Sequence, residues 1–229
     1  LDEEHQDICE LIVEHAGRVL ANPISKTRDY RGQRLMAYLQ RATALIALRR
    51  HEEAEKLCKE ALEFKEGYLD AVMILGHCYF EQGRMIEARA QYEKYLKLRK
   101  DYRADDEIEN VIMRYLDSEH VAWFSLGMID HQANNIDEAI DSYRHVLETQ
   151  EFYRDTFCRL GKLYFDKEEF DTAEAYFRKE LEISPQSVKA WFGLGLSCEK
   201  LEQLAEAAKA MKAAAENAPR DTLIAFQAG

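Results

Sequence analysis

Apolar residues recur at a fixed interval of 34 positions in the second half of the chain. Each copy carries an aromatic residue three positions before a Leu-Gly pair, an alanine twelve positions after the glycine and a bulky residue four positions further on. A fixed period of this length indicates stacked units of paired helices. The copies contain Trp123, Leu126, Gly127, Ala139 and Tyr143; Phe157, Leu160, Gly161, Ala173 and Phe177; and Trp191, Leu194, Gly195, Ala207 and Met211.

The same register extends towards the N-terminus. Aligning Ala54 and Ala88 with the later alanines adds two earlier units, of which the first has lost its glycine. We therefore predict units 1 and 2 over residues 35–100 and units 3 to 5 over residues 120–221. Each unit is expected to hold two helices of about 13 residues joined by a short polar turn.

The N-terminal region, residues 1–33, has a pattern of its own. Residues 3–21 predict one helix that ends before Pro23, and residues 24–33 are polar and predict a connecting loop. We interpret the helix as a cap, because a stacked repeat cannot bury its first hydrophobic face alone. Its apolar stripe contains Ile8, Leu11, Ile12, His15, Val19 and Leu20.

Two further segments interrupt or follow the repeats. The interval between units 2 and 3 is 17 positions longer than one period, and residues 101–118 carry an apolar stripe that predicts an inserted helix. This helix either packs into the groove of the array or perturbs the array locally. Residues 222–229 match the start of a further, truncated unit. We therefore expect the repeats to continue in a longer parent protein.

Glycines at one register position are the strongest packing signal. A glycine inside a helix costs about 1 kcal/mol relative to alanine, so local propensity does not explain Gly76, Gly127, Gly161 and Gly195. Close approach of the second helix of each unit explains them, with the register alanines as the facing positions. The large aromatic residues at Trp123 and its equivalents are expected to fill the space between neighbouring units.

Composition narrows the classes of partner. The chain has 229 residues and a formal charge of -12, from 31 basic and 43 acidic residues. This balance disfavours nucleic acid and anionic lipid as partners. No apolar run of about 18 residues is present, so we expect no membrane insertion. The five cysteines are scattered, which is typical of reduced thiols, and we expect a cytoplasmic protein.

No constellation of catalytic residues is recognisable. His77-Cys78 and His131 lack the short spacings of a zinc site, and a phosphate-binding glycine loop is missing. The basic stretch from Lys97 to Arg103 is interrupted by an acidic residue and is better explained as a solvated helix end. We therefore predict a non-enzyme without a cofactor or a bound metal.

The repeat landmarks resemble the tetratricopeptide repeat (TPR) family over residues 35–221, apart from the insertion. The resemblance implies an all-α fold, a right-handed superhelical solenoid of antiparallel helix pairs. It also implies a concave groove, lined by the first helix of each unit, that binds peptides or proteins. Chaperone-binding members clamp a C-terminal carboxylate with lysine, arginine and an asparagine at position 9 of the unit. None of these five units has asparagine at that position, so we set that activity aside.

The family pattern also implies which residues face the groove. The candidate binding residues are rich in methionine and aromatic side chains, and such surfaces suit an apolar or amphipathic segment. In unit 1 the implied positions are Met36, Leu39, Thr43, Ile46 and Ala47. In the later units the candidates are Met73, His77, Phe80, Phe124, Met128, His131, Lys162, Phe165, Phe192 and Leu196.

The leading hypothesis is a protein-interaction scaffold that holds a segment of a partner in this groove. Packing of the groove against the inserted helix, the cap or a second copy of the chain stays open as an alternative. The order of repeats, insertion and further repeats also looks like the regions that follow family 2 glycosyltransferase domains in some bacteria. That likeness would make the chain an accessory region of a larger enzyme. Self-assembly through the convex face is a third hypothesis.

Overall fold

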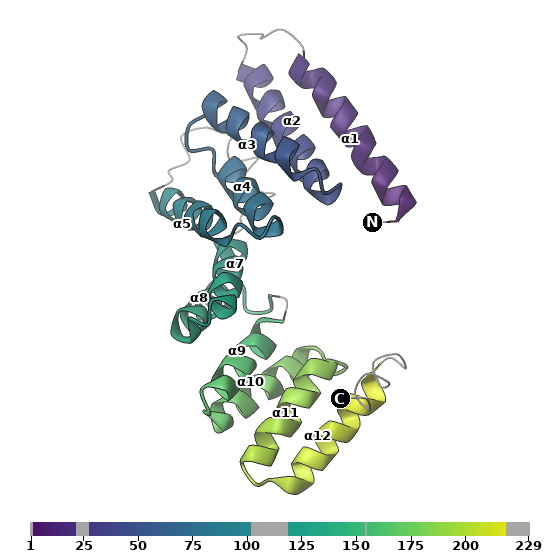
Figure 1. Ribbon diagram of the computed structural model, residues 1–229, viewed down its shortest axis with the longest axis vertical. Coiled ribbons are helices and arrows are strands. Elements are labelled where there is room, and N and C mark those ends of the chain that lie inside the picture. The colour runs from purple at the N-terminus through teal and green to yellow at the C-terminus, as the bar shows by residue number, and fades with distance from the viewer. Residues whose placement is uncertain (1, 22–27, 102–118, 154, 219–229) are drawn as a thin grey trace. The chain divides into compact units, whose positions relative to one another are not determined.

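The computed structural model describes residues 2–21, 28–101, 119–153 and 155–218 (Figure 1). Within these ranges the chain is all-helical, with eleven helices and no strand, which confirms the predicted fold class. The helices are α1 (Glu3–Ala21), α2 (Arg28–Ala47), α3 (His51–Phe64), α4 (Leu69–Glu81), α5 (Met85–Asp101), α7 (Glu119–Gln132), α8 (Ile136–Thr149), α9 (Thr156–Asp166), α10 (Phe170–Ile183), α11 (Val188–Lys200) and α12 (Leu204–Asn217).

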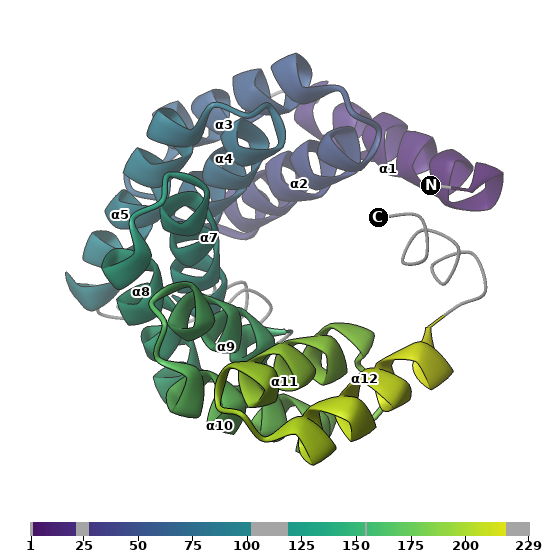
Figure 2. The ribbon, with the colours of Figure 1, turned by 60° about the horizontal axis from the view of Figure 1, so that its bottom comes forward.

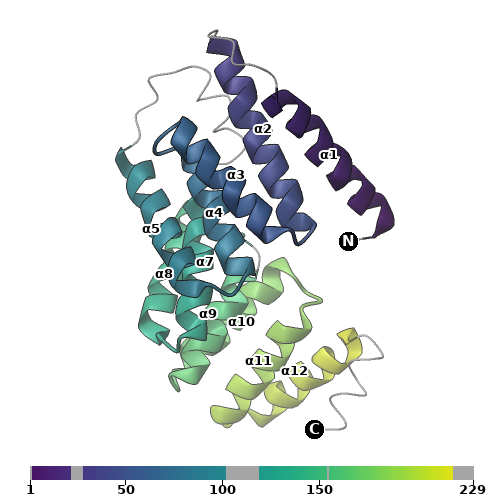
Figure 3. The same cartoon turned by 45° about the horizontal axis from the view of Figure 1, so that its top comes forward.

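The chain divides into two compact units, Leu1–Ala122 and Trp123–Gly229. In the first unit each helix from α1 to α5 packs against the next one, and α2 also contacts α4. In the second unit the same sequential packing joins α8 to α12, and α9 contacts α11. Figure 2 shows the helix pairs of the second unit, and Figure 3 shows α2 lying between α1 and α3. Sequential helix pairs are the arrangement that the 34-residue period predicts.

The structure corrects one boundary near the N-terminus. Helix α1 has the predicted range, but α2 begins at Arg28, inside the segment 24–33 that was expected to be a loop. The predicted inserted helix lies outside the described residues from position 102 onward, and so does the truncated unit at 222–229.

A shared turn joins the two helices of every repeat. The second residue after the first helix has a positive φ. Its N–H and the next N–H donate to carbonyls three and five positions earlier. In the turn after α9, for example, Glu168 donates to Phe165 at 2.9 Å and Glu169 donates to Tyr164 at 2.9 Å. This Schellman pattern satisfies the last carbonyls of the first helix. The left-handed residues of these turns, with φ between 60° and 74°, are Arg49, Gly83, Asn134, Glu168 and Glu202.

The glycines allow close contact between the helices of a repeat, as predicted. A Cβ added to Gly127 would lie 2.8 Å from the ring of Tyr143, and one added to Gly161 would lie 2.9 Å from the ring of Phe177. Heavy atoms do not approach a Cβ this closely. The facing group is therefore the bulky residue sixteen positions after the glycine. The sequence had instead suggested the register alanine at this position.

Phe177 also links consecutive repeats in the second unit. A Cβ added to Gly193 in α11 would lie only 2.3 Å from Cζ of Phe177. The ring, which is almost fully buried on α10, thus occupies the space left by Gly161 in α9 and by Gly193 in α11. One side chain holds three helices together because two glycines make room for it.

We expect Gly193→Ala to destabilise the protein by about 1–3 kcal/mol, because Phe177 cannot move without disturbing two helices. Gly17→Ala is the matched control, since its Cβ would meet only the flexible guanidinium of Arg41 at 3.4 Å. That change should be neutral or stabilising by up to about 1 kcal/mol through helix propensity. Urea unfolding of both variants tests this, and effects of the same sign would contradict it.

The turns give a second test of the fold. Glu202 occupies a left-handed conformation that costs a side chain about 1 kcal/mol and glycine almost nothing. Glu202→Gly should therefore raise the free energy of unfolding by about 1 kcal/mol, and Gly83→Ala should lower it by a similar amount. Thermal unfolding monitored by circular dichroism measures both changes. A destabilised Glu202→Gly protein would contradict this expectation. It would show that a contact of the Glu202 side chain stabilises the fold by more than the left-handed conformation costs.

Candidate protein-binding surfaces

Helix α1 packs through small residues and leaves larger apolar ones exposed. Val13 and Ala16 are buried against α2, whereas Ile8 and Leu11 keep 50% and 65% of their surfaces exposed. The predicted inward-facing stripe was therefore wrong for its first half. Small side chains let α1 lie close to α2, and the wider apolar side chains project beside that contact instead of into it.

Two arginines of the first unit bind α1, one at its last turn and one near its middle. Arg34 of α2 donates a hydrogen bond to the carbonyl of Leu20 at 3.1 Å, which satisfies a carbonyl in the last turn of α1. Arg50 forms an ion pair with Glu10 at 3.2 Å. These contacts hold the exposed face of α1 in one orientation.

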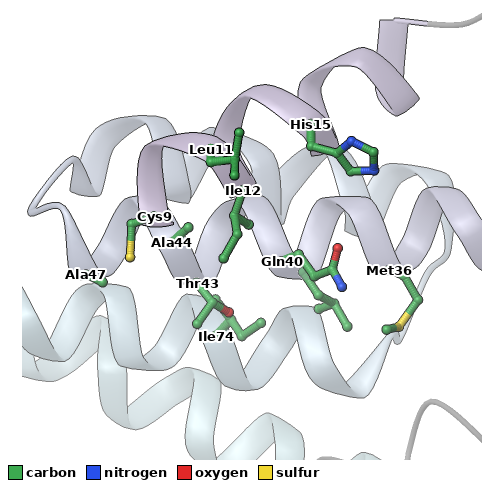
Figure 4. A pocket seen from close by; sticks show the side chains of 11 residues that line it. Cys9, Leu11, Ile12, His15, Met36, Gln40, Thr43, Ala44, Ala47 and Ile74 are labelled. Carbon is green, nitrogen blue, oxygen red and sulfur yellow. The ribbon is translucent and has the colours of Figure 1, made fainter. Parts of the chain in front are cut away.

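An open groove of about 930 Å³ lies between α1, α2 and α4 in the first unit (Figure 4). The close-up shows Ile12 pointing from α1 towards Thr43 of α2 and Ile74 of α4. The groove is mainly apolar and has no lysine, arginine, aspartate or glutamate in its lining. The lining residues are Cys9, Leu11, Ile12, His15, Met36, Leu39, Gln40, Thr43, Ala44, Ala47 and Ile74.

The floor of this groove follows the predicted register. Met36, Leu39, Thr43 and Ala47 are four of the five positions of unit 1 that the family pattern places in the groove, and all four line it. Ile46, the fifth, does not. Small side chains at positions 43, 44 and 47 leave the space open. The contribution of α1 was missed, although Ala16-Gly17 in its sequence marks the side that can approach another helix closely.

The other candidate residues of the first unit lie along α4. Met73 is buried, Phe80 is half-buried and His77 is exposed. None of the three lines the α1–α2–α4 groove, where α4 contributes Ile74. Of the three, only His77 is exposed to solvent.

Phe124 in the second unit is part of the core. It is 2% exposed and lies edge-on to Tyr143 and Tyr153, with ring centroids 5.5 and 5.3 Å apart. The guanidinium of Arg159 sits 5.0 Å from the centre of its ring. A charge placed at this position would disturb folding, so Phe124 is unsuitable for testing a binding surface.

The remaining candidates of the second unit are more accessible. Lys162 is exposed and forms an ion pair with Asp166 at 2.9 Å. Burial lowers the pKa of His131, and the positive charge of Lys162 lowers it further, so His131 is neutral near pH 7. The half-buried members of this set are Met128, His131, Phe165, Phe192 and Leu196.

The thiols and histidines offer little reactive chemistry. Burial raises the pKa of Cys58 to about 12 and that of Cys158 to about 11, so both stay protonated. The thiol of Cys78, next to His77, donates to the carbonyl of His51 at 3.2 Å. Among the residues that the structure describes, no three metal-ligating side chains come together, and no helix is long and apolar enough to cross a bilayer.

Three family models match the chain, at residues 45–105, 120–153 and 158–222, and each is described as a tetratricopeptide repeat. The helix pairs, the glycine register and these matches agree. The chain belongs to the tetratricopeptide repeat family, whose members mediate protein–protein interactions and are typically non-catalytic.

Two relatives match parts of the chain. The BBSome complex member BBS4 homolog of Drosophila melanogaster is 26% identical over 148 residues, which is 64% of this chain and 30% of the relative. Cilia- and flagella-associated protein 70 of Homo sapiens is 38% identical over 58 residues, which is 25% of this chain and 5% of the relative. The chain thus spans less than a third of either protein.

Solved structures show the same fold. BtubC from P. vanneervenii aligns with a TM-score of 0.71 at 20% identity, over 94% of this chain and 90% of its own. YrrB, described as a TPR protein with an unusual peptide-binding site, aligns at 0.66 and 18%, over 84% and 91%. MamA aligns at 0.65 and 21%, over 80% and 91%. The likeness to regions that follow glycosyltransferase domains finds no support in these matches.

Asp70 is a charged group in an unusual place. It is 1% exposed in the first turn of α4, and its Oδ2 atom has no hydrogen-bond partner. Burial raises its pKa to about 6, although the Tyr68 hydroxyl and the Lys65 charge act in the opposite direction. Because the folded pKa lies above the unfolded value, ionising this carboxyl removes stability as the pH rises from about 4 to above 6.

We therefore expect Asp70→Asn to be more stable than the wild type at pH 8, by up to about 3 kcal/mol, and to gain much less at pH 4. Comparing the two proteins by urea unfolding at both pH values isolates Asp70 from the other carboxylates. Glu182→Gln, at an exposed position, is the control and should show no such difference. A constant gap between wild type and Asp70→Asn would contradict the assignment.

Proposed function

We propose that this chain is an interaction scaffold that holds an apolar or amphipathic segment of a partner protein, with the α1–α2–α4 groove as its principal site. The observation that carries the proposal is the exposure of Ile8 and Leu11 beside an apolar groove of about 930 Å³. Exposed apolar surface next to a concavity is typical of an interaction site. Burying each of these side chains contributes up to about 1.5–3 kcal/mol.

The dimensions of the groove support a peptide segment as its ligand. Its floor on α2 runs from Met36 to Ala47, which is roughly 16 Å along the helix axis. That length matches about three turns of a partner helix. Met36 has an unbranched, flexible side chain, so this part of the groove can adjust to the side chains that enter it.

We further propose that the first helices of the second unit form an additional contact surface. Its residues are the predicted set on α7, α9 and α11, without the buried Phe124. This face is largely uncharged because His131 is neutral and Lys162 is paired with Asp166. It suits a second apolar stretch of the same partner or a different protein.

Membership of a larger assembly fits this function. The matched Drosophila relative is named as a member of a protein complex, and a scaffold of short helix pairs supplies surfaces rather than chemistry. Self-association through the exposed face of α1 is the competing function that an observation favours, because the same apolar residues could meet in a second copy of the chain. Light scattering at high and low concentration distinguishes the two.

The decisive experiment compares three baits in a pull-down from native lysate. Wild type and Ile86→Glu should capture the same partner, and Ile8→Glu/Leu11→Glu should lose it. Ile86 is the matched control, because it is an apolar residue with 85% exposure on α5. Circular dichroism checks that all three proteins remain folded.

Equal capture by all three baits would show that this groove is not the functional site. A partner that depends on Phe192 or Leu196 instead would move the function to the second surface.

A further inference from the structure

We infer that the groove takes a basic amphipathic helix of about three turns. This inference rests on the proposed function and adds the charge and the conformation of the partner. Three observations carry it: the acidity of α1, the placement of its unpaired carboxylates beside the exposed apolar residues, and the shortage of hydrogen-bonding groups in the groove.

Helix α1 is strongly acidic. Its range Glu3–Ala21 contains five acidic residues and one arginine. Arg18 is already paired with Glu14 at 2.5 Å, and Glu10 is paired with Arg50 at 3.2 Å. Of the five acidic residues of α1, Glu3, Glu4 and Asp7 form no ion pair with any described residue.

Two of these carboxylates lie next to the exposed apolar side chains. Glu4 precedes Ile8 by four residues and Asp7 precedes Leu11 by four residues, so each pair shares one face of the helix. The lining of the groove itself has no acidic or basic side chain. Charge recognition therefore takes place at the rim formed by α1, above an apolar floor.

A basic amphipathic segment matches this arrangement. Apolar residues at i, i+3 or i+4, and i+7 would enter the groove, and lysines or arginines beside them would reach the carboxylates of α1. The long aliphatic stems of lysine and arginine can cover Leu11 while their charges stay in water. The interaction at the exposed rim is expected to steer association and to weaken with salt.

The groove favours a helix over an extended chain. Gln40, Thr43 and His15 are the main side chains in its lining that can hydrogen-bond. An extended peptide would leave most of its backbone N–H and C=O groups unsatisfied against Leu39, Ala44 and the other apolar residues, at a cost for each group. A helix satisfies these groups internally, and the described residues offer no strand edge for pairing.

Charge also argues against the two competing occupants. A second copy would bring one acidic α1 against another, which is unfavourable at the exposed rim. An anionic membrane would meet the same carboxylates, and repulsion would oppose its approach. A cationic partner is the one for which both the floor and the rim are favourable.

The test uses three synthetic 14-residue peptides labelled with a fluorophore. All carry the same leucine ridge, and their polar positions are lysine in the first, glutamate in the second, and lysine with a central proline in the third. Fluorescence anisotropy with the wild-type chain should show the lysine peptide binding at least tenfold tighter than either other peptide at low salt. This preference over the glutamate peptide should shrink in 0.5 M NaCl.

Variants separate the floor from the rim. Glu4→Gln/Asp7→Asn should weaken the lysine peptide at least threefold and leave the glutamate peptide unchanged or slightly tighter. Ile8→Glu/Leu11→Glu should abolish specific binding of the lysine peptide, and Ile86→Glu should not affect it. Circular dichroism excludes unfolding as the cause.

The outcomes distinguish this inference from the function on which it rests. Equal binding of the lysine and glutamate peptides, or unimpaired binding of the proline peptide, overturns the charge or the helix assignment and leaves the groove as a binding site. A groove-dependent protein from the lysate that binds through an acidic or extended segment does the same. A dimer that Ile8→Glu/Leu11→Glu dissociates overturns the inference in favour of a second copy. Failure of every peptide together with unchanged lysate capture overturns both proposals.

Discussion

The close contact between a glycine and a large side chain holds each of the well-formed repeats together. In the second unit the ring of Phe177 lies within 3.0 Å of the positions where Cβ atoms would stand on Gly161 and Gly193. The helical register, the crossing of the helix pairs and the spacing of neighbouring repeats all depend on this fit. Because no other residue leaves that space empty, glycine recurs at the same position of these repeats. This recurrence makes the pattern recognisable in the sequence.

The first repeat solves the same problem with different residues. Ala42 stands where later repeats have glycine, and Cys58 stands where they have an aromatic residue or methionine. Both are buried. Compared with the later repeats, the first repeat therefore has a larger side chain on its first helix and a smaller one on its second helix. The neighbouring positions on α2 are also small, and α1 turns Val13 and Ala16 towards them. An open groove beside an exposed apolar face is the result, next to the repeat whose sequence pattern is weakest.

The sequence predicts the interior better than the surface. The glycine register and the turn positions follow from local sterics, so the repeats, the helix pairs and the short turns could be predicted. The face of α1 could not, because Ile8 and Leu11 have helical spacing and a packed face was the natural expectation. Instead, small residues of α1 pack against α2 because they allow closer contact between the two helices. Phe124 shows the opposite error, since a register position that faces outward in the family is covered here by Tyr143, Tyr153 and Arg159.

The distribution of the five thiols has a practical consequence. Cys58 and Cys78 are buried in the first unit, and Cys158 and Cys198 are buried in the second, so a thiol reagent reaches these sulfurs only when the unit that contains them opens. Cys9 is half-buried in the lining of the groove. Its rate of alkylation therefore reports whether the groove is occupied, while the other four report local opening of each unit separately. The chain carries its own set of labels for following both processes without an added probe.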